Sequence, residues 1–517
     1  MKKIFPFFLI FICYLQGSAQ VLSSAQIDSL TELTLKTFDV PGIAVAVIKD
    51  GKLIHAKGYG VRSLRRKEKV TEHTLFGIAS NSKAFTSAAL AMLVDEKKIT
   101  WNDKVIDYIP EFRMYDPYVT NAFTIKDLLT HRSGLGLGAG DLMFFPDGSD
   151  FTMKDILFNL RYLKQVSEFR TKYDYDNNLY IVAGEIIRRV SGMSWEEFIQ
   201  KRILTPLDMN ETAPGFSLLK DSSNVIDAHA PVNGVVQPIA REWSNVANAA
   251  GGIYSNLTDM AKWLTMQMEH GRYGPALSKR LFSMDASEEM WSPQTIIDVR
   301  GTSVYNTHFA SYGLGWFLSD VKGYKQASHT GGLAGIVTQV TLFPELKLGI
   351  VVFTNQQSGA AFTAITNSIK DGYLGIPQSN RVKQYHDRVV ANEAAAKKIT
   401  DAIAKEIADR QKIAGTADMK PFLGTYHDNW LGDITISVKN GKPWFDSKRS
   451  PRLTGEMLPY KGNTFVVKWN DRSMDADAFA MFELDADGNA SGLKMKAISP
   501  LTDFSYDFHD LNFTKKK

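Results

Sequence analysis

Cysteine is almost absent from this chain of 517 residues, because Cys13 is the only one. It lies in an apolar run, residues 4–15, that follows Lys2 and Lys3 and precedes the small residues 17–19. This pattern is typical of a secretory signal cleaved after residue 19. An uncleaved membrane anchor is the alternative, although the run is short for a bilayer span. Without the leader the chain has no cysteine, which excludes disulfides, thiolate chemistry and cysteine-ligated metal.

An excess of charge is also lacking. The formal net charge is +4, and the loss of Lys2 and Lys3 with the signal lowers it to +2. A balance so close to neutral gives no electrostatic footprint for nucleic acid. Beyond the leader no apolar run is long enough to cross a membrane. The histidines show no His-x-x-x-His spacing, so we expect no metal site.

The apolar content of 44% and charged content of 22% are typical of a soluble globular protein, and the length favours two domains. Periodicity predicts a helix at 24–38, a hairpin at 43–56 around Asp50-Gly51, and a helix from about Ser80. Short strands follow a mixed middle section, at 338–353. Strands at both ends of this region around a helical middle predict one sheet built from both ends.

The composition changes near residue 380. Residues 382–413 are rich in Ala, Lys, Glu and Asp, which favours a connecting helix, with isoleucines spaced by four for packing. The remaining residues alternate with period two around the turns Asn440-Gly441 and Asp487-Gly488. Such spacing predicts a small antiparallel barrel or sandwich.

One helix start carries a candidate nucleophile. Ser80 precedes Lys83 by three residues, so both side chains share one helical face. A serine hydroxyl needs a base to take its proton, and a lysine amine can be that base if burial lowers its pKa. Alone the pattern is weak, since a capping serine beside a surface lysine is common.

Two further motifs complete a candidate site. Tyr175-Asp176-Asn177 supplies a phenol that can shuttle protons, if a neighbouring ammonium lowers its pKa, and an amide that can bind a carbonyl or the lysine. His329-Thr330-Gly331-Gly332 precedes a strand, and its glycines permit close approach of a substrate backbone. The N–H groups of Ser80 and Gly332 are candidates for an oxyanion hole.

In this order and spacing, the three motifs make the chain resemble the serine β-lactamase-like family, in its branch of class C β-lactamases, D,D-peptidases and esterases. The strings 128–135, 250–255 and 312–316 support the resemblance, which covers about residues 25–375. It implies an α/β (α+β) fold, with an antiparallel sheet flanked by helices plus a helical domain. The C-terminal segment is similar to the lipocalin-like barrel often appended to such hydrolases.

These observations divide the chain into four parts: a signal at 1–19, a hydrolase domain at 20–380, a connecting helix at 381–417 and a β domain at 418–517. We expect the β domain to fold separately and to contribute no catalytic group. It would either cover the cleft mouth or hold subunits together.

The leader implies a periplasmic or secreted location. The resemblance implies a serine hydrolase that cleaves an amide or ester, with D-amino-acid peptides among the candidates. Ser80 is the expected nucleophile, Lys83 and Tyr175 move its proton, and Asn177, His329, Thr330 and Gly331 bind substrate. No cofactor is required. The expected partner is a small molecule or short peptide, without nucleic acid or stable membrane insertion, and a homo-oligomer is left open.

Two alternatives remain, a penicillin-binding or sensor-type protein that acylates without turnover and a true β-lactamase. Typical β-lactamases carry lysine where this chain has His329, which leaves efficient β-lactam turnover in doubt. Protonation of His329 would change the binding of an anionic substrate between about pH 5 and 8.

Overall fold

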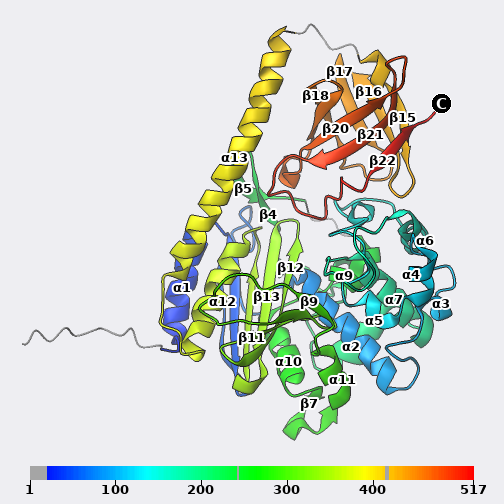
Figure 1. The fold of residues 1–517 in the computed structure, drawn as a ribbon. Helices are drawn as coiled ribbons and strands as arrows, with labels where there is room; N and C mark the ends of the chain where they lie inside the picture. Colours follow the sequence, from blue (N-terminus) through cyan, green and yellow to red (C-terminus); the bar gives the residue numbers. More distant parts are fainter. Residues whose placement is uncertain (1–19, 241–243, 414–418) are drawn as a thin grey trace, which may run out of the picture.

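One eight-stranded antiparallel sheet organises the first part of the chain (Figure 1). The computed structural model describes residues 20–240, 244–413 and 419–517, so the predicted signal at 1–19 lies outside the described residues. The strands follow in spatial order: β2 (Lys52–Gly60), β1 (Gly42–Lys49), β14 (Leu348–Thr354), β13 (Ile336–Phe343), β12 (Tyr324–Leu333), β11 (Phe317–Val321), β10 (Ala310–Tyr312) and β9 (Thr295–Ile297). Both ends of the region therefore contribute to one sheet, as the strand pattern predicts.

Helices cover both faces of this sheet, which explains why β1 is apolar along almost its whole length. Ile43, Val45 and Val47 pack in a cluster with α1 (Ser24–Thr37) and α12 (Gly359–Tyr373). The alternate residues of β1 belong to the core that includes α2 (Ser82–Asp95) and α10 (Leu257–Met268). Successive strand residues point to opposite faces, so both sets are buried. The expected α/β fold with a flanked antiparallel sheet is confirmed.

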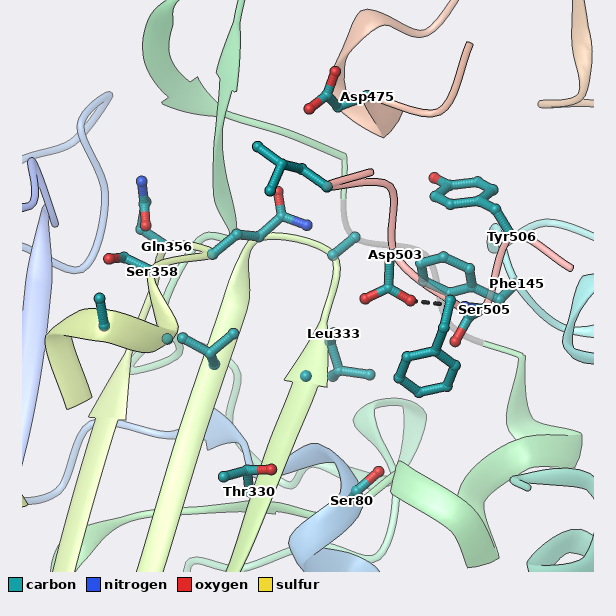
Figure 2. A pocket seen from close by; sticks show the side chains of 18 of the residues that line it. Ser80, Phe145, Thr330, Leu333, Gln356, Ser358, Asp475, Asp503, Ser505 and Tyr506 are labelled. Carbon is teal, nitrogen blue, oxygen red and sulfur yellow. Dashed lines mark hydrogen bonds between the residues drawn. The ribbon is translucent and has the colours of Figure 1, made fainter. Parts of the chain in front are cut away.

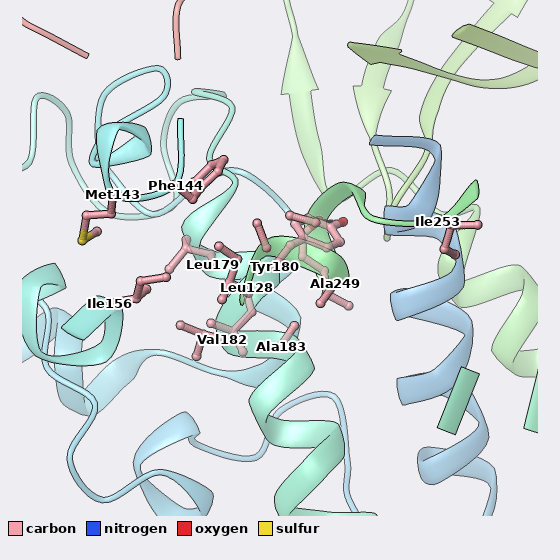
Figure 3. Packing of buried hydrophobic residues seen from close by; sticks show 14 of the residues in the cluster. Leu128, Met143, Phe144, Ile156, Leu179, Tyr180, Val182, Ala183, Ala249 and Ile253 are labelled. Carbon is pink, nitrogen blue, oxygen red and sulfur yellow. Dashed lines mark hydrogen bonds between the residues drawn. The ribbon is translucent and has the colours of Figure 1, made fainter. Parts of the chain in front are cut away.

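A helical region lies beside the sheet and is centred on α2 and α7 (Asn178–Ser191) (Figures 1 and 3). Every residue of α2 from Ser82 to Leu93 is buried, as expected for a helix that is packed on all sides. Leu179, Tyr180 and Val182 of α7 pack among residues of neighbouring elements (Figure 3). The other helices of the region are α3 (Val105–Tyr108), α4 (Pro117–Ala122), α5 (Ile125–Leu128), α6 (Met153–Asn159), α8 (Trp195–Ile199), α9 (Asn248–Gly251) and α11 (Met284–Met290).

The strand β12 lies against the short helical turn η1 (Ala79–Asn81) that precedes α2. The Thr338 hydroxyl donates to the Ile78 carbonyl over 3.0 Å and accepts from the Asn81 amide over 2.9 Å. At Gly331 an added Cβ would meet the Ile78 carbonyl oxygen and lie 2.9 Å from Cβ of Ala79. Glycine is therefore the residue that fits between strand and turn.

A single long helix, α13 (Arg381–Ile413), leads from the sheet domain to a closed barrel (Figure 1). The antiparallel strands of the barrel are β15 (Gly424–Asp428), β16 (Gly432–Lys439), β17 (Lys442–Ser447), β18 (Thr454–Pro459), β19 (Thr464–Trp469), β20 (Ala478–Leu484), β21 (Ala490–Ala497) and β22 (Asn512–Lys515). Ile403 and Ile407 of α13 pack on Val466 of the barrel, whereas Ile399 is 44% exposed. The predicted connecting helix ends in residues 414–417, outside the described ones.

The barrel docks on the helical region through polar and aromatic contacts. Arg449 forms ion pairs with Asp150 at 2.6 Å and with Asp155 at 3.2 Å. The Asn159 amide donates to the Trp430 carbonyl over 2.8 Å. In the part of the chain that the structure describes, no helix has the length and apolar character needed to cross a membrane.

We expect Gly331→Ala to lower the free energy of unfolding by about 1–3 kcal/mol, because the new methyl group forces β12 away from η1. Gly332→Ala is the matched control, since an added Cβ there meets nothing within 4 Å; its effect should stay within about 0.5 kcal/mol. Urea denaturation of both variants measures the difference. Equal stabilities would contradict the tight packing at Gly331.

Candidate active site

Ser80 and Lys83 lie where the chain turns from the two-residue strand β3 (Phe76–Gly77) into α2. Ala79, immediately before Ser80, has a φ of +49°, in the left-handed region that a residue with a Cβ rarely adopts. Strain of this kind, of order 1–3 kcal/mol, persists where surrounding contacts fix the backbone, and it gathers at functional sites. The contacts of β12 and Thr338 with η1 provide that support here.

Lys83 is fully buried and makes three polar contacts. Its Nζ lies 3.0 Å from the Ser80 hydroxyl oxygen, 2.7 Å from Oδ1 of Asn177 and 2.8 Å from the carbonyl oxygen of Ala250. Burial lowers the pKa of Lys83 to about 7, although the carboxyls of Asp141 and Asp176 act in the opposite direction. The amine can therefore lose its proton near neutral pH, as a base for the Ser80 hydroxyl must.

The second motif meets the first at the start of α7. Asn177 donates from Nδ2 to Oδ2 of Asp141 over 2.8 Å, while its Oδ1 faces Lys83. His131 accepts the backbone N–H of Asp176 at Nδ1 over 3.0 Å, and its ring lies 4.2 Å from that of Tyr175. His131 therefore holds the loop that presents Tyr175.

The condition stated for Tyr175, a pKa lowered by a neighbouring ammonium, is not met. Lys83 Nζ lies 4.8 Å from the centre of the Tyr175 ring, close enough for an ammonium to stabilise a phenolate. Burial nevertheless raises the pKa of Tyr175 well above its usual value, and the lowering effect of its contact with Ser80 does not compensate. Tyr175 thus remains a neutral phenol that can donate its proton.

The expected titration of His329 between pH 5 and 8 is wrong. Its Nδ1 lies 2.6 Å from the Thr330 carbonyl oxygen, which can only accept, and its Nε2 lies 2.8 Å from the hydroxyl of Tyr312. Burial and the nearby Lys83 lower the pKa of His329 to about 3. The ring stays neutral and fully engaged with protein groups, so it does not provide a cation for a substrate.

The third motif presents an open strand edge to Ser80. Pairing of β11 with β12 ends at Phe317 and Ser328, whereas pairing of β12 with β13 continues to Leu333. Beyond Ser328, the backbone of β12 therefore has no paired strand on the edge that faces away from β13. Thr330 is exposed there, and Figure 2 shows its side chain near Ser80 at the floor of the pocket. An extended substrate can bind such an edge as an added strand.

A cleft of about 800 Å³ opens above these residues (Figure 2). Three parts of the chain line it. The hydrolase region contributes residues from each of the three motifs, among them Ser80, Tyr175 and Thr330, and α13 contributes His386 and Glu393. The barrel contributes Asp475, Asp503 and Phe504, among others. The barrel therefore forms a wall of the cleft, which favours the alternative in which the β domain covers the cleft mouth. That it contributes no catalytic group stays a prediction.

Several residues at the site carry no motif in the sequence. Asp141 follows a glycine-rich loop and belongs to none of the three motifs. Ala250 begins the supporting string 250–255, but it contacts Lys83 through its backbone carbonyl, which no residue type encodes. Asp507 of the barrel accepts the Gly140 N–H over 2.6 Å. Ser80, Asn177, Thr330 and Gly332 all line the cleft as their motifs suggest, while their catalytic and binding roles stay predictions.

Within residues 20–240, 244–413 and 419–517, one group of side chains has the spacing of metal ligands. Ligand atoms of Asp507, His509 and Asp510 lie within 4.8 Å of one another. The Asp507 carboxylate, however, already accepts the Gly140 N–H and lies 3.3 Å from Nδ1 of His509. The Asp507 carboxylate is thus already engaged by protein groups.

Known proteins share both the sequence pattern and the fold. A domain of unknown function, DUF3471, matches residues 408–515. An unguisins hydrolase of Aspergillus violaceofuscus, UngD, is 29% identical over 464 residues, which cover 82% of this chain and 80% of the relative. Protein Flp of Staphylococcus aureus is 27% identical over 348 residues, which cover 65% of this chain and 64% of the relative.

The solved structure of an octameric penicillin-binding protein homologue from Pyrococcus abyssi superimposes with a TM-score of 0.60. It covers 96% of this chain and 100% of its own, at 21% sequence identity, which shows a common fold. The β-lactamase family model matches residues 27–371, well over half of the chain. The chain therefore belongs to the β-lactamase family.

Proposed function

We propose that this protein is a periplasmic or secreted serine hydrolase that cleaves an amide or ester through an acyl-enzyme on Ser80. The observation that carries the proposal is the position of the Lys83 amine, buried beside the Ser80 hydroxyl and between two oxygen acceptors. The leader pattern at 1–19 supports the compartment.

A neutral amine has two N–H groups and one lone pair. The oxygens of Asn177 and Ala250 can only accept, so they take both N–H groups of neutral Lys83. The lone pair is then left for the third contact, the hydroxyl of Ser80 at 3.0 Å. The geometry suits a base that removes the serine proton as the oxygen attacks a carbonyl.

The shifted pKa values divide the acid and base roles. The pKa of Lys83 is about 7 and that of Tyr175 is raised well above its usual value, so the amine accepts the Ser80 proton while the phenol is still protonated and available as the acid. Tyr175 gives its proton to the leaving group and recovers one from the Lys83 ammonium. The N–H groups of Ser80 and Gly332 stabilise the oxyanion. Water then releases the acyl group by the reverse proton route.

The charges around the cleft favour a peptidase or esterase over a β-lactamase. Carboxylates of Asp475, Asp503 and Glu393 line the cleft, and His329 stays neutral. Arg452 also lines it but forms an ion pair with Asp471 at 2.6 Å. A β-lactam or peptide carboxylate therefore meets no free cation among these groups. The relative named an unguisins hydrolase supports hydrolysis as the reaction class.

The alternative is a protein that acylates but does not turn over, because the same groups would acylate Ser80 in a sensor. Multiple turnovers of a chromogenic ester or D-aminoacyl amide support the hydrolase. One stoichiometric burst supports the alternative.

A phosphonate probe should add its mass to the peptide that contains Ser80. Ser80→Ala should abolish both labelling and hydrolysis, and Lys83→Ala should slow them by about 10³-fold or more, because the proton acceptor is lost. Mass spectrometry and steady-state assays measure these effects, with circular dichroism to check folding. Full activity in Ser80→Ala would eliminate the proposed nucleophile.

The rate of Ser80 labelling should rise with pH through about 7 and then level off. Only unprotonated Lys83 accepts the serine proton, and burial lowers the pKa of Lys83 to about 7 from 10.5. Below that pH the rate should fall about tenfold per unit. A pH series between 4 and 9 with a neutral probe tests this. A profile that has not levelled off by pH 9 would place the pKa well above 7, toward that of an exposed lysine.

Esters with a cationic acyl end should be hydrolysed with a higher kcat/KM than matched esters with an anionic end. The carboxylate of Asp503 points into the cleft (Figure 2), so Asp503→Asn should reduce the ratio, and added salt should do the same. Asp485→Asn is the control, because its carboxylate lies in an exposed turn of the barrel between β20 and β21. An unchanged ratio in Asp503→Asn would show that the wall does not select charge.

A further inference from the structure

A loop of the barrel contacts the segment that precedes Asp141. Between β21 and β22, Asp507 is fully buried, and its Oδ2 accepts the backbone N–H of Gly140 over 2.6 Å. In the same loop, Phe504 covers Gly138, where an added Cβ would lie 2.8 Å from the phenyl ring. The Phe504 and Tyr175 rings lie 5.8 Å apart, edge to face.

The segment that Asp507 contacts, residues 138–141, is also connected to the second motif. The Gly138 N–H donates to the Tyr175 carbonyl over 2.8 Å, and the Asn178 amide donates to the Ala139 carbonyl over 2.9 Å. Asp141, the next residue after Gly140, accepts from the Asn177 amide over 2.8 Å. Buried contacts thus lead from Asp507 through Gly140, Asp141 and Asn177 to Lys83.

We propose, on the basis of the function given above, that Asp507 is a positioning residue through which the C-terminal barrel orders the base of the hydrolase. Asp507 fixes the turn at Gly140, the turn places Asp141, and Asp141 sets the orientation of the Asn177 amide at Lys83.

The orientation of the amide decides what Lys83 meets. An asparagine side chain has a donor end and an acceptor end of nearly the same shape. An oxygen of Asp141 accepts from Nδ2, so Oδ1 is directed to Lys83. The reverse orientation would place two N–H donors opposite each other and remove one of the two acceptors that leave the lysine lone pair for Ser80.

Gly140 cannot replace the contact with Asp507 by bonding to solvent. The residue is buried, with the Leu163 side chain 2.8 Å from the position of an added Cβ. A buried N–H without an acceptor is unfavourable, so the turn would shift if Asp507 were lost. Burial raises the pKa of both Asp141 and Asp507, and Asp510 adds to the effect at Asp507. An asparagine keeps one acceptor oxygen without a charge. At position 507 it would retain the acceptor for Gly140 and lose the longer contact, in which Asp507 accepts the Asp510 N–H over 3.3 Å. Asparagine is therefore the closest substitute for either residue.

The experiment compares variants of the full chain by the rate at which the phosphonate probe labels Ser80 across pH. Asp507→Ala should slow labelling about tenfold at pH 7, whereas Asp507→Asn should restore most of the rate. The midpoint of the pH profile should move upward in Asp507→Ala, because a looser turn admits water and the pKa of Lys83 is held down by burial. Arg449→Ala, which removes peripheral ion pairs between the same two domains, is the control and should label at the native rate.

A second pair of variants tests the same contacts if Asp507→Ala fails to fold. Asp141→Asn keeps an acceptor for the Asn177 amide and should stay close to the native rate, whereas Asp141→Ala should slow labelling about tenfold.

Each contrary result has a distinct meaning. No labelling of Ser80 in the native protein contradicts the proposed function. Native labelling with an unchanged rate and midpoint in Asp507→Ala, or equal slowing in Asp507→Asn, overturns the positioning role. Equal slowing in Arg449→Ala also overturns it, because general loosening of the domains would then explain the loss.

Discussion

The burial of one amine is the constraint on which the rest of the structure depends. Lys83 can act as a base only if its ammonium form is disfavoured, and the protein achieves this by removing water from around Nζ. Three elements must then meet at one point. α2 is buried along nearly its whole length, α7 begins directly after the residue that offers an amide oxygen, and α9 provides a carbonyl. The large core beside the sheet holds these three helices together.

Acidic residues surround that amine without binding it as a salt bridge. Burial raises the pKa of Asp176 to about 7 and that of Asp141 well above its usual value. Ionised, these carboxyls would stabilise the Lys83 ammonium and remove the base. Burial of these carboxyls therefore favours the neutral form of the Lys83 amine, as burial of Lys83 itself does. The docked barrel contributes to this dry environment, since Asp507 and Phe504 lie against the loop that carries Asp141.

Much of the fold and part of the site could be predicted from sequence, because their causes are local. The hairpin at 43–56, the long helix before the barrel and the spacing of Ser80 and Lys83 follow from periodicity, turn residues and motifs. The pKa of His329 and that of Tyr175 could not, because they depend on burial by segments far away in the chain. Asp141 and Asp507 belong to no sequence motif. The contact through Gly140 that connects them forms only when the barrel packs on the rest of the chain.

The open edge of β12 has a stereochemical consequence. A chain that binds there in extended form points successive substituents in opposite directions, as any strand does. A ligand bound on this edge would therefore direct successive substituents to opposite sides of its own backbone. Asp503 and Phe504 place part of the barrel in the wall of the cleft. A change of handedness at one position of such a ligand would redirect its substituent, so an open strand edge of this kind can distinguish mirror-image ligands.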